Sequence, residues 1–157
     1  MKPVEAPFAN ANAVLSGAQF ADSYSMTVKD LNLDAEGAAR LSFGRSPKWI
    51  KALMRLRNAI VRPFGLKSGA GGKAVLAYNV GVFPVLSHSA RRVTLGANDK
   101  HLDFRLLVDV EDLGAGRQRV TASTAVKTHN LLGRTYLGFV KPFHRIIVPA
   151  MLAQISR

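Results

Sequence analysis

The feature that most constrains the fold is a strict alternation of apolar and polar side chains between residues 101 and 110. The apolar positions are Leu102, Phe104, Leu106, Val108 and Val110. Side chains of a β-strand point to its two faces in turn, so this segment predicts a strand with one face on a core. The turn Gly114-Ala115-Gly116 and a Thr- and Val-rich segment at 118–129 follow. Residues 101–129 are therefore predicted to form a β-hairpin with long arms.

Weaker strand patterns lie on the N-terminal side of this hairpin. In the segment 22–28, Tyr24, Met26 and Val28 share one face of a half-buried strand. Further strands are predicted at 74–80, 83–88 and 92–97, before a turn at 98–100. The sequence thus predicts a run of antiparallel strands.

Three segments have helical signals. Residues 33–43 carry acidic side chains early and Arg40 late, which suits a short helix. Ser46 and Pro47 are a capping residue and a first-turn residue, and Pro63 ends the segment, so a helix is predicted at 47–62. The Gly-rich connection 67–73 lacks the spacing of a phosphate-binding loop and is interpreted as a linker.

The longest helical pattern runs from Leu132 to Ser156. Its apolar stripe consists of Leu132, Tyr136, Phe139, Val140, Phe143, Ile146, Ile147, Ala150 and Met151. Pro142 and Pro149 lie on a flank away from this stripe, so their kinks should bend the helix towards its apolar face. A bent helix suits a curved sheet.

The length of 157 residues predicts one α+β domain at 21–157, preceded by a loose arm at 1–20. The absence of cysteine excludes disulfides and thiolate chemistry. We recognise neither a signal peptide nor a membrane-spanning segment, and from this exclusion we expect a cytoplasmic protein.

The formal net charge of +12 is unevenly distributed. No acidic residue lies between Glu36 and Asp99, and none follows Asp112. Such a field favours anionic partners, whether lipid headgroups, nucleic acid or acidic small molecules. On the helix 47–62 the basic stripe consists of Lys48, Lys51, Arg55 and Arg62. A basic stripe of this kind is usually a solvated helix face.

The predicted order is a strand, two short helices, a run of antiparallel strands and one long terminal helix. It resembles the helix-grip architecture of START-like and Bet v 1-like (SRPBCC) domains, in which a curved sheet wraps the last helix and leaves a cavity. The resemblance becomes more specific in four stretches, which are 57–67, Phe83-Pro84-Val85, 101–105 and 140–145. Together they resemble an uncharacterised bacterial family, the domain of unknown function 2867, over residues 20–155. This resemblance implies a fold and carries no activity.

Arg57 lies in the middle of the apolar arc of the helix 47–62. A buried guanidinium needs partners, so Arg57 could pair with a carboxylate or bind an anionic group of a ligand. Alternatively the helix end lifts off the sheet and the side chain reaches solvent.

His144 lies at the edge of the apolar stripe of the last helix, where it could line a cavity mouth and exchange protons. A structural histidine is the simpler interpretation. His101, Asp103 and Arg105 share the strand face opposite the core, which favours an exposed ion-paired row over a catalytic cluster.

The sequence contains no motif for metal binding or for a serine nucleophile. His88, His101, His129 and His144 lack metal-ligand spacing, and no serine lies in a nucleophile elbow. We expect neither a metal nor a cofactor.

The leading hypothesis is a domain that binds an apolar or amphipathic small molecule between sheet and terminal helix. Candidate ligand-binding residues are Arg57, Phe104, Tyr136, Phe139, Phe143 and His144. The same stripe could instead fill the interior solidly. A second hypothesis is an enzyme on the same scaffold that acts on a carbonyl or phenolic substrate through Arg57 and His144. A third is a binder of anionic membrane or nucleic acid through the basic stripe.

Overall fold

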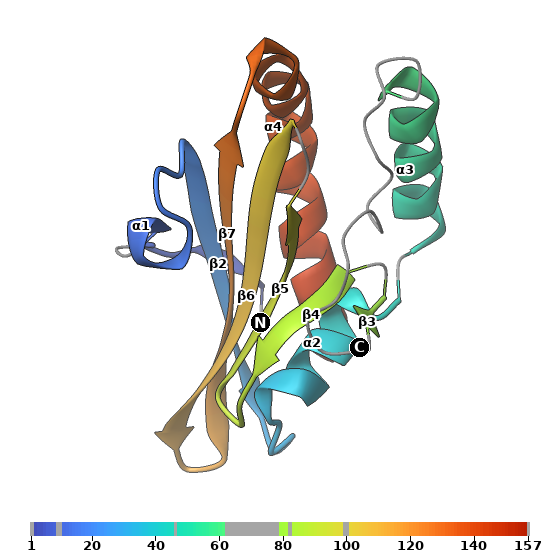
Figure 1. The fold of residues 1–157 in the computed structure, drawn as a ribbon. Helices are drawn as coiled ribbons and strands as arrows, with labels where there is room; N and C mark the ends of the chain where they lie inside the picture. The colour runs from blue at the N-terminus through green and yellow to red at the C-terminus, as the bar shows by residue number, and fades with distance from the viewer. Residues whose placement is uncertain are drawn as a thin grey trace.

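The computed structural model describes residues 2–8, 11–45, 47–61, 79–81, 83–98 and 101–156. Within them the chain forms one curved, seven-stranded antiparallel sheet with the strand order β1-β2-β7-β6-β5-β4-β3 (Figure 1). The strands are β1 (Val4–Glu5), β2 (Phe20–Lys29), β3 (Asn79–Val80), β4 (Phe83–His88), β5 (Arg92–Asn98), β6 (Leu102–Gly114) and β7 (Arg117–Thr128).

The predicted hairpin at 101–129 is confirmed as β6 and β7. Its register places Leu102 opposite Thr128 at one end and Asp112 opposite Gln118 near the turn. Gly114, Ala115 and Gly116 all have positive φ, of 79°, 54° and 72°. This left-handed backbone is easy for glycine and explains the Gly-x-Gly turn.

The helices are α1 (Ala11–Val14), α2 (Ala35–Phe43), α3 (Lys48–Val61) and α4 (Leu131–Leu152), and α4 continues into the 3-10 turn η2 (Ala153–Ser156). Two of them begin at a capping side chain. Asp34 accepts a hydrogen bond from the Gly37 amide at 2.7 Å, and Asn130 accepts one from the Gly133 amide at 2.9 Å. Such caps satisfy amides that lack a partner in the first turn. The three predicted helices are therefore present near their predicted boundaries.

The first twenty residues contain β1 and α1. Val4 and Glu5 pair with Ser25 and Tyr24 of β2. Gln19 accepts hydrogen bonds from the amide and the hydroxyl of Thr128. Both contacts tie parts of the predicted arm to the sheet.

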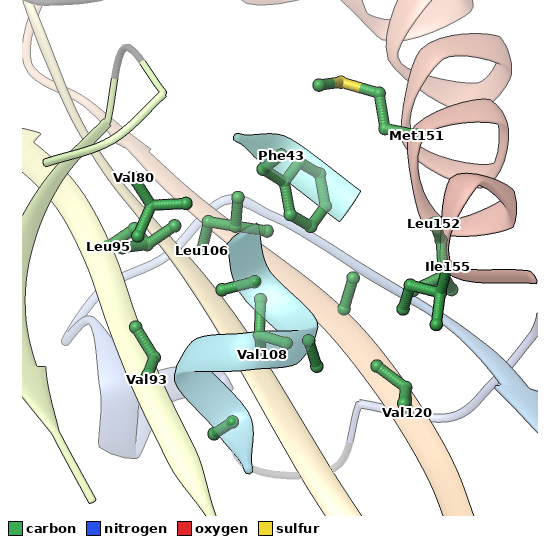
Figure 2. Close-up of a cluster of buried hydrophobic side chains, with 14 of the residues drawn as sticks. Phe43, Val80, Val93, Leu95, Leu106, Val108, Val120, Met151, Leu152 and Ile155 are labelled. Carbon is green, nitrogen blue, oxygen red and sulfur yellow. The ribbon is translucent and has the colours of Figure 1, made fainter. Parts of the chain in front are cut away.

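Helices α2 and α4 cover one face of the sheet, with α2 over β5 and β6 and α4 over β2 and β7. The core lies where α2 and the end of α4 meet the strands (Figure 2). The labelled core residues are Phe43, Val80, Val93, Leu95, Leu106, Val108, Val120, Met151, Leu152 and Ile155. Full burial of one such aliphatic or aromatic side chain contributes roughly 1.5–3 kcal/mol. The core thus fixes the last turns of α4 on the sheet.

Candidate functional site

Helix α4 is rotated relative to the prediction from its apolar stripe. Ile146 is 60% exposed and Phe139 is 44% exposed, whereas Val148 is buried. The residues that meet the sheet lie along one border of the stripe, which is marked by Gly133, His144 and the stripe residue Met151. At about 100° per residue, this edge is roughly a quarter turn away from the centre of the predicted stripe. The face of α4 that meets the sheet is therefore one edge of the apolar stripe and the residues beside it, and not the centre of the stripe.

The two flanks of this sheet-facing edge have different neighbours. On one flank, the Lys141 ammonium lies 5.5 Å from the centre of the Phe20 ring on β2. Arg145, on the same flank, acts electrostatically on Tyr24 of the same strand. This flank is directed towards β2 and its neighbour β1. The opposite flank is therefore directed towards β6, β5 and β4, which lie on the other side of β7 (Figure 1).

The flank towards β4 to β6 carries the predicted aromatic residues. We call Tyr136, Phe139 and Phe143 the aromatic flank of α4. Tyr136 and Phe143 are half-buried, and the rings of Phe139 and Phe143 lie 5.5 Å apart.

On the sheet, Phe104 of β6 contacts Phe83 of β4, with the ring centres 6.1 Å apart. Phe83 in turn contacts Phe43 of α2, and the centres of these two rings lie 6.3 Å apart. Phe43 is buried, but Phe83 and Phe104 are only half-buried although they belong to the helix-covered face. The first half of α4 thus leaves part of this face incompletely covered.

The polar centre of the site joins β2 to α4. His144 Nε2 lies 3.0 Å from Asp22 Oδ1, and the two side chains are 17% and 10% exposed. The edge of the His144 ring also packs on Phe20, with ring centres 5.5 Å apart. A carboxylate only accepts hydrogen bonds, so Nε2 carries a proton and donates a hydrogen bond to Asp22 Oδ1.

At this polar centre, two buried oxygen atoms have no hydrogen-bond partner among the described residues. They are Asp22 Oδ2 and Thr124 Oγ1. Asp22 and Thr124 lie directly opposite each other in the register of β2 and β7, and both point to the helix-covered face. Neighbouring Cβ atoms in such a pair lie about 5 Å apart. Buried polar groups are nearly always satisfied in proteins, so these two atoms need an explanation.

Tyr24 lies next to this centre on the same face of β2. Burial, followed by the negative charges of Asp22 and Glu5, raises the pKa of the Tyr24 phenol above its ordinary value of 10.0, while Arg145 acts in the opposite direction. The phenol therefore keeps its proton more firmly in the folded protein.

Two predicted site residues fall outside the described part. The backbone of Arg57 belongs to α3, but its side chain is outside the described residues, and so is Arg62. The remaining members of the basic stripe, Lys48, Lys51 and Arg55, are exposed.

The row His101, Asp103 and Arg105 forms bonds to other residues and not within itself. His101 Nδ1 lies 2.9 Å from the side-chain Nδ2 of Asn130, and Oδ1 of Asp103 lies 3.0 Å from Nε2 of His129. Arg105 donates to Asn98 at 2.8 Å. The geometry of the described residues gives these three side chains separate structural partners.

Asp22 and Thr124 were not among the predicted site residues. The signal for Asp22 is present in the sequence, because it shares the alternation phase of Tyr24, Met26 and Val28. A carboxylate on an otherwise apolar strand face is unusual. Thr124 gives no such signal, because threonine is common in strands.

Across the described residues, no three potential metal ligands gather in one place. None of the helices in that part of the chain is both long and apolar enough to cross a membrane.

The fold and site define an α+β domain with a curved antiparallel sheet, a long C-terminal helix, and a buried polar pair beside half-buried aromatic side chains. Residues 14–151 match the family model described as a protein of unknown function (DUF2867). The chain belongs to this family, as four sequence stretches indicated. A comparison with curated proteins found no match.

Proposed function

We propose that the protein binds a small, largely apolar molecule between the aromatic flank of α4 and the strands β4 to β6. The observation that carries this proposal is the partial exposure of Phe83 and Phe104 on the helix-covered face of the sheet. In this proposal the domain is a helix grip of the START-like and Bet v 1-like (SRPBCC) type. The sheet and the last helix would then hold the ligand between them.

The energetics support binding at this place. Apolar surface left in water costs about 25 cal/mol per Å² relative to burial, and aromatic side chains are the largest contributors. A ligand that covers Phe104 and the half-buried Phe143 gains this energy without rearrangement of the core, which lies at the other end of α4. Ligand sites are typically apolar with a few well-placed polar groups. Thr124 of β7 is a diagonal neighbour of Phe104 in the pairing of β6 with β7, and Asp22 of β2 lies opposite Thr124, so these two side chains border the proposed site.

Nile red tests the proposal, because this neutral dye becomes fluorescent in apolar surroundings. We expect saturable binding to the wild-type protein, and about tenfold weaker binding to Phe104→Ala and Phe143→Ala, since a good aromatic contact contributes about 1.4 kcal/mol. Leu131→Ala is the matched control, because Leu131 is an exposed apolar residue of the same helix. Circular dichroism shows whether each variant is folded.

Absence of saturable binding, or equal affinity in all four proteins, would refute the proposal. If the dye binds as expected, mass spectrometry of an organic extract of the purified protein would identify a natural ligand.

A second function, attachment to an anionic membrane surface, is favoured by the exposed face of α3. Lys48, Lys51 and Arg55 are exposed there together with Trp49 and Leu56. Trp49 and Leu56 are seven residues apart and lie about 20° from each other around the helix, and the basic side chains lie about 80–160° away from them. A helix that exposes basic and apolar side chains together is typical of membrane interfaces, whereas nucleic acid requires only the charges.

The single tryptophan makes this second proposal measurable. With vesicles that contain one quarter phosphatidylglycerol in phosphatidylcholine, we expect co-sedimentation and a blue shift of Trp49 fluorescence. Lys51→Glu/Arg55→Glu and high salt should abolish both effects. Lys29→Glu, an exposed change on β2, is the control. Binding to pure phosphatidylcholine, or to DNA without any vesicle binding, would contradict this function.

A further inference from the structure

The orphaned atoms Asp22 Oδ2 and Thr124 Oγ1 specify what the ligand presents to the site. We infer that the ligand of the proposed site carries a neutral hydroxyl group, of an alcohol or a phenol, that binds between these two side chains. This inference rests on the proposed function. It adds the chemical class of the ligand and the two residues that recognise it.

The hydrogen-bonding capacity of each side chain leads to a hydroxyl group. Oδ1 of Asp22 is already occupied by His144, so the carboxylate has Oδ2 left and requires a donor there. The Thr124 hydroxyl has a proton of its own to donate and requires an acceptor. A hydroxyl group of the ligand that lies between these two side chains donates a hydrogen bond to Asp22 Oδ2 and accepts one from Thr124 Oγ1. One group therefore satisfies both atoms.

Charged ligand groups fit this position less well. An anionic group would lie against the Asp22 carboxylate, and repulsion in a poorly hydrated place is costly. An ammonium group could donate to Asp22 but has no lone pair for the Thr124 proton. It would also approach a protein of net charge +12.

The depth of the site gives this contact its discriminating power. Thr124 is 6% exposed, and Asp22 is nine-tenths buried. A hydrogen bond to a buried charged group contributes more than one between neutral groups, and a ligand that cannot form it leaves the carboxylate unsatisfied. A site of this kind rejects an analogue without the hydroxyl proton.

Competition against Nile red with 2-naphthol and 2-methoxynaphthalene tests the inference. The two probes share the aromatic body, but only 2-naphthol can donate a proton. We expect the wild-type protein to bind 2-naphthol about tenfold more tightly. Asp22→Asn and Thr124→Val should each reduce this preference to about threefold or less, while Nile red still binds. Thr121→Val, on the opposite face of β7, should retain the full preference.

The outcomes separate the two proposals. Equal affinity of the wild-type protein for both probes would overturn the hydroxyl inference and leave the proposal of ligand binding intact. Equal affinity is expected if a bound water molecule satisfies Asp22 Oδ2 and Thr124 Oγ1. A tenfold preference that persists in both variants would also overturn it, because the hydroxyl would then bind elsewhere. The hydroxyl inference is also overturned if 2-naphthol does not displace Nile red while Nile red binding depends on Phe104, because 2-naphthol then binds outside the proposed site. If Nile red does not bind at all, both proposals fail.

Discussion

The Cα atom of Gly133, in the first turn of α4, packs directly against the backbone carbonyl of His101 at the beginning of the β6 hairpin. A Cβ atom at position 133 would lie far inside van der Waals contact with that oxygen. The same oxygen accepts a hydrogen bond from the His129 amide at 2.9 Å, so it cannot move freely. Only glycine lets the helix begin this close to the sheet.

Replacement of Gly133 by alanine should therefore destabilise the protein by about 1–3 kcal/mol, as overpacking typically does. Gly138 provides the control, because a Cβ there meets no atom within 4 Å. Gly138→Ala should stabilise the same helix by roughly 0.5–1 kcal/mol, the ordinary helix preference of alanine over glycine. Urea denaturation measures both. Equal effects of the two substitutions would show that the contact at Gly133 is unimportant.

Thr124→Val should raise the stability of the ligand-free protein by about 1 kcal/mol, because it removes a buried hydroxyl without a partner and keeps the shape. Thr128→Val is the control, because Thr128 lies on the same strand and the same face as Thr124 and is equally buried. The Thr128 hydroxyl, however, donates a hydrogen bond to Gln19. Thr128→Val should lower the stability by a similar amount. Thermal unfolding of both variants decides the matter, and a loss of stability in Thr124→Val would mean that the hydroxyl is satisfied in solution.

The phenol of Tyr24 should make the folded protein sensitive to alkali. Burial and the charges of Asp22 and Glu5 raise the pKa of Tyr24 above 10.0, so the folded state holds this proton more tightly than the unfolded state. The resulting stability is fully present below pH 10 and is lost as the pH rises through the raised pKa. In urea titrations at several pH values, Tyr24→Phe should show a shallower alkaline loss. Parallel curves for the two proteins would exclude this contribution.

The two ends of α4 should differ strongly in their sensitivity to truncation. Leu152→Ala removes a fully buried side chain and should cost about 2–5 kcal/mol. Leu131→Ala changes an exposed residue and should stay within about 0.5 kcal/mol of the wild type. Chemical denaturation of the two variants checks this. A large loss in Leu131→Ala would mean that the first turn is covered in solution.

Local patterns predicted the elements of the fold well. The alternation at 102–110 gave the strand and its inner face, and the residues around Pro47 marked the start of α3. These signals are local because they depend on period and capping. The strand β1 was missed because two residues carry no period.

The rotation of α4 and the polar centre of the site could not be predicted from local patterns. The stripe gave the most apolar side of the helix, but Gly133 allows a closer approach at another edge. The bond between Asp22 and His144 joins residues 122 positions apart, and only the pairing of the strands brings them together. The helical period places His144 at the edge of the stripe, but it gives no indication that Asp22 is its partner.

The position of β2 between β1 and β7 has a consequence for how the chain assembles. The longest partner of β2 is β7, and residues 20 and 126 face each other although more than a hundred residues separate them. During synthesis β2 leaves the ribosome long before β7 exists, so its backbone groups lack their main partner. Closing so large a loop is slow compared with formation of the local β6–β7 hairpin. The hairpin should therefore form first and serve as the template onto which β2 is added. The newly made chain carries an unpaired strand in the meantime.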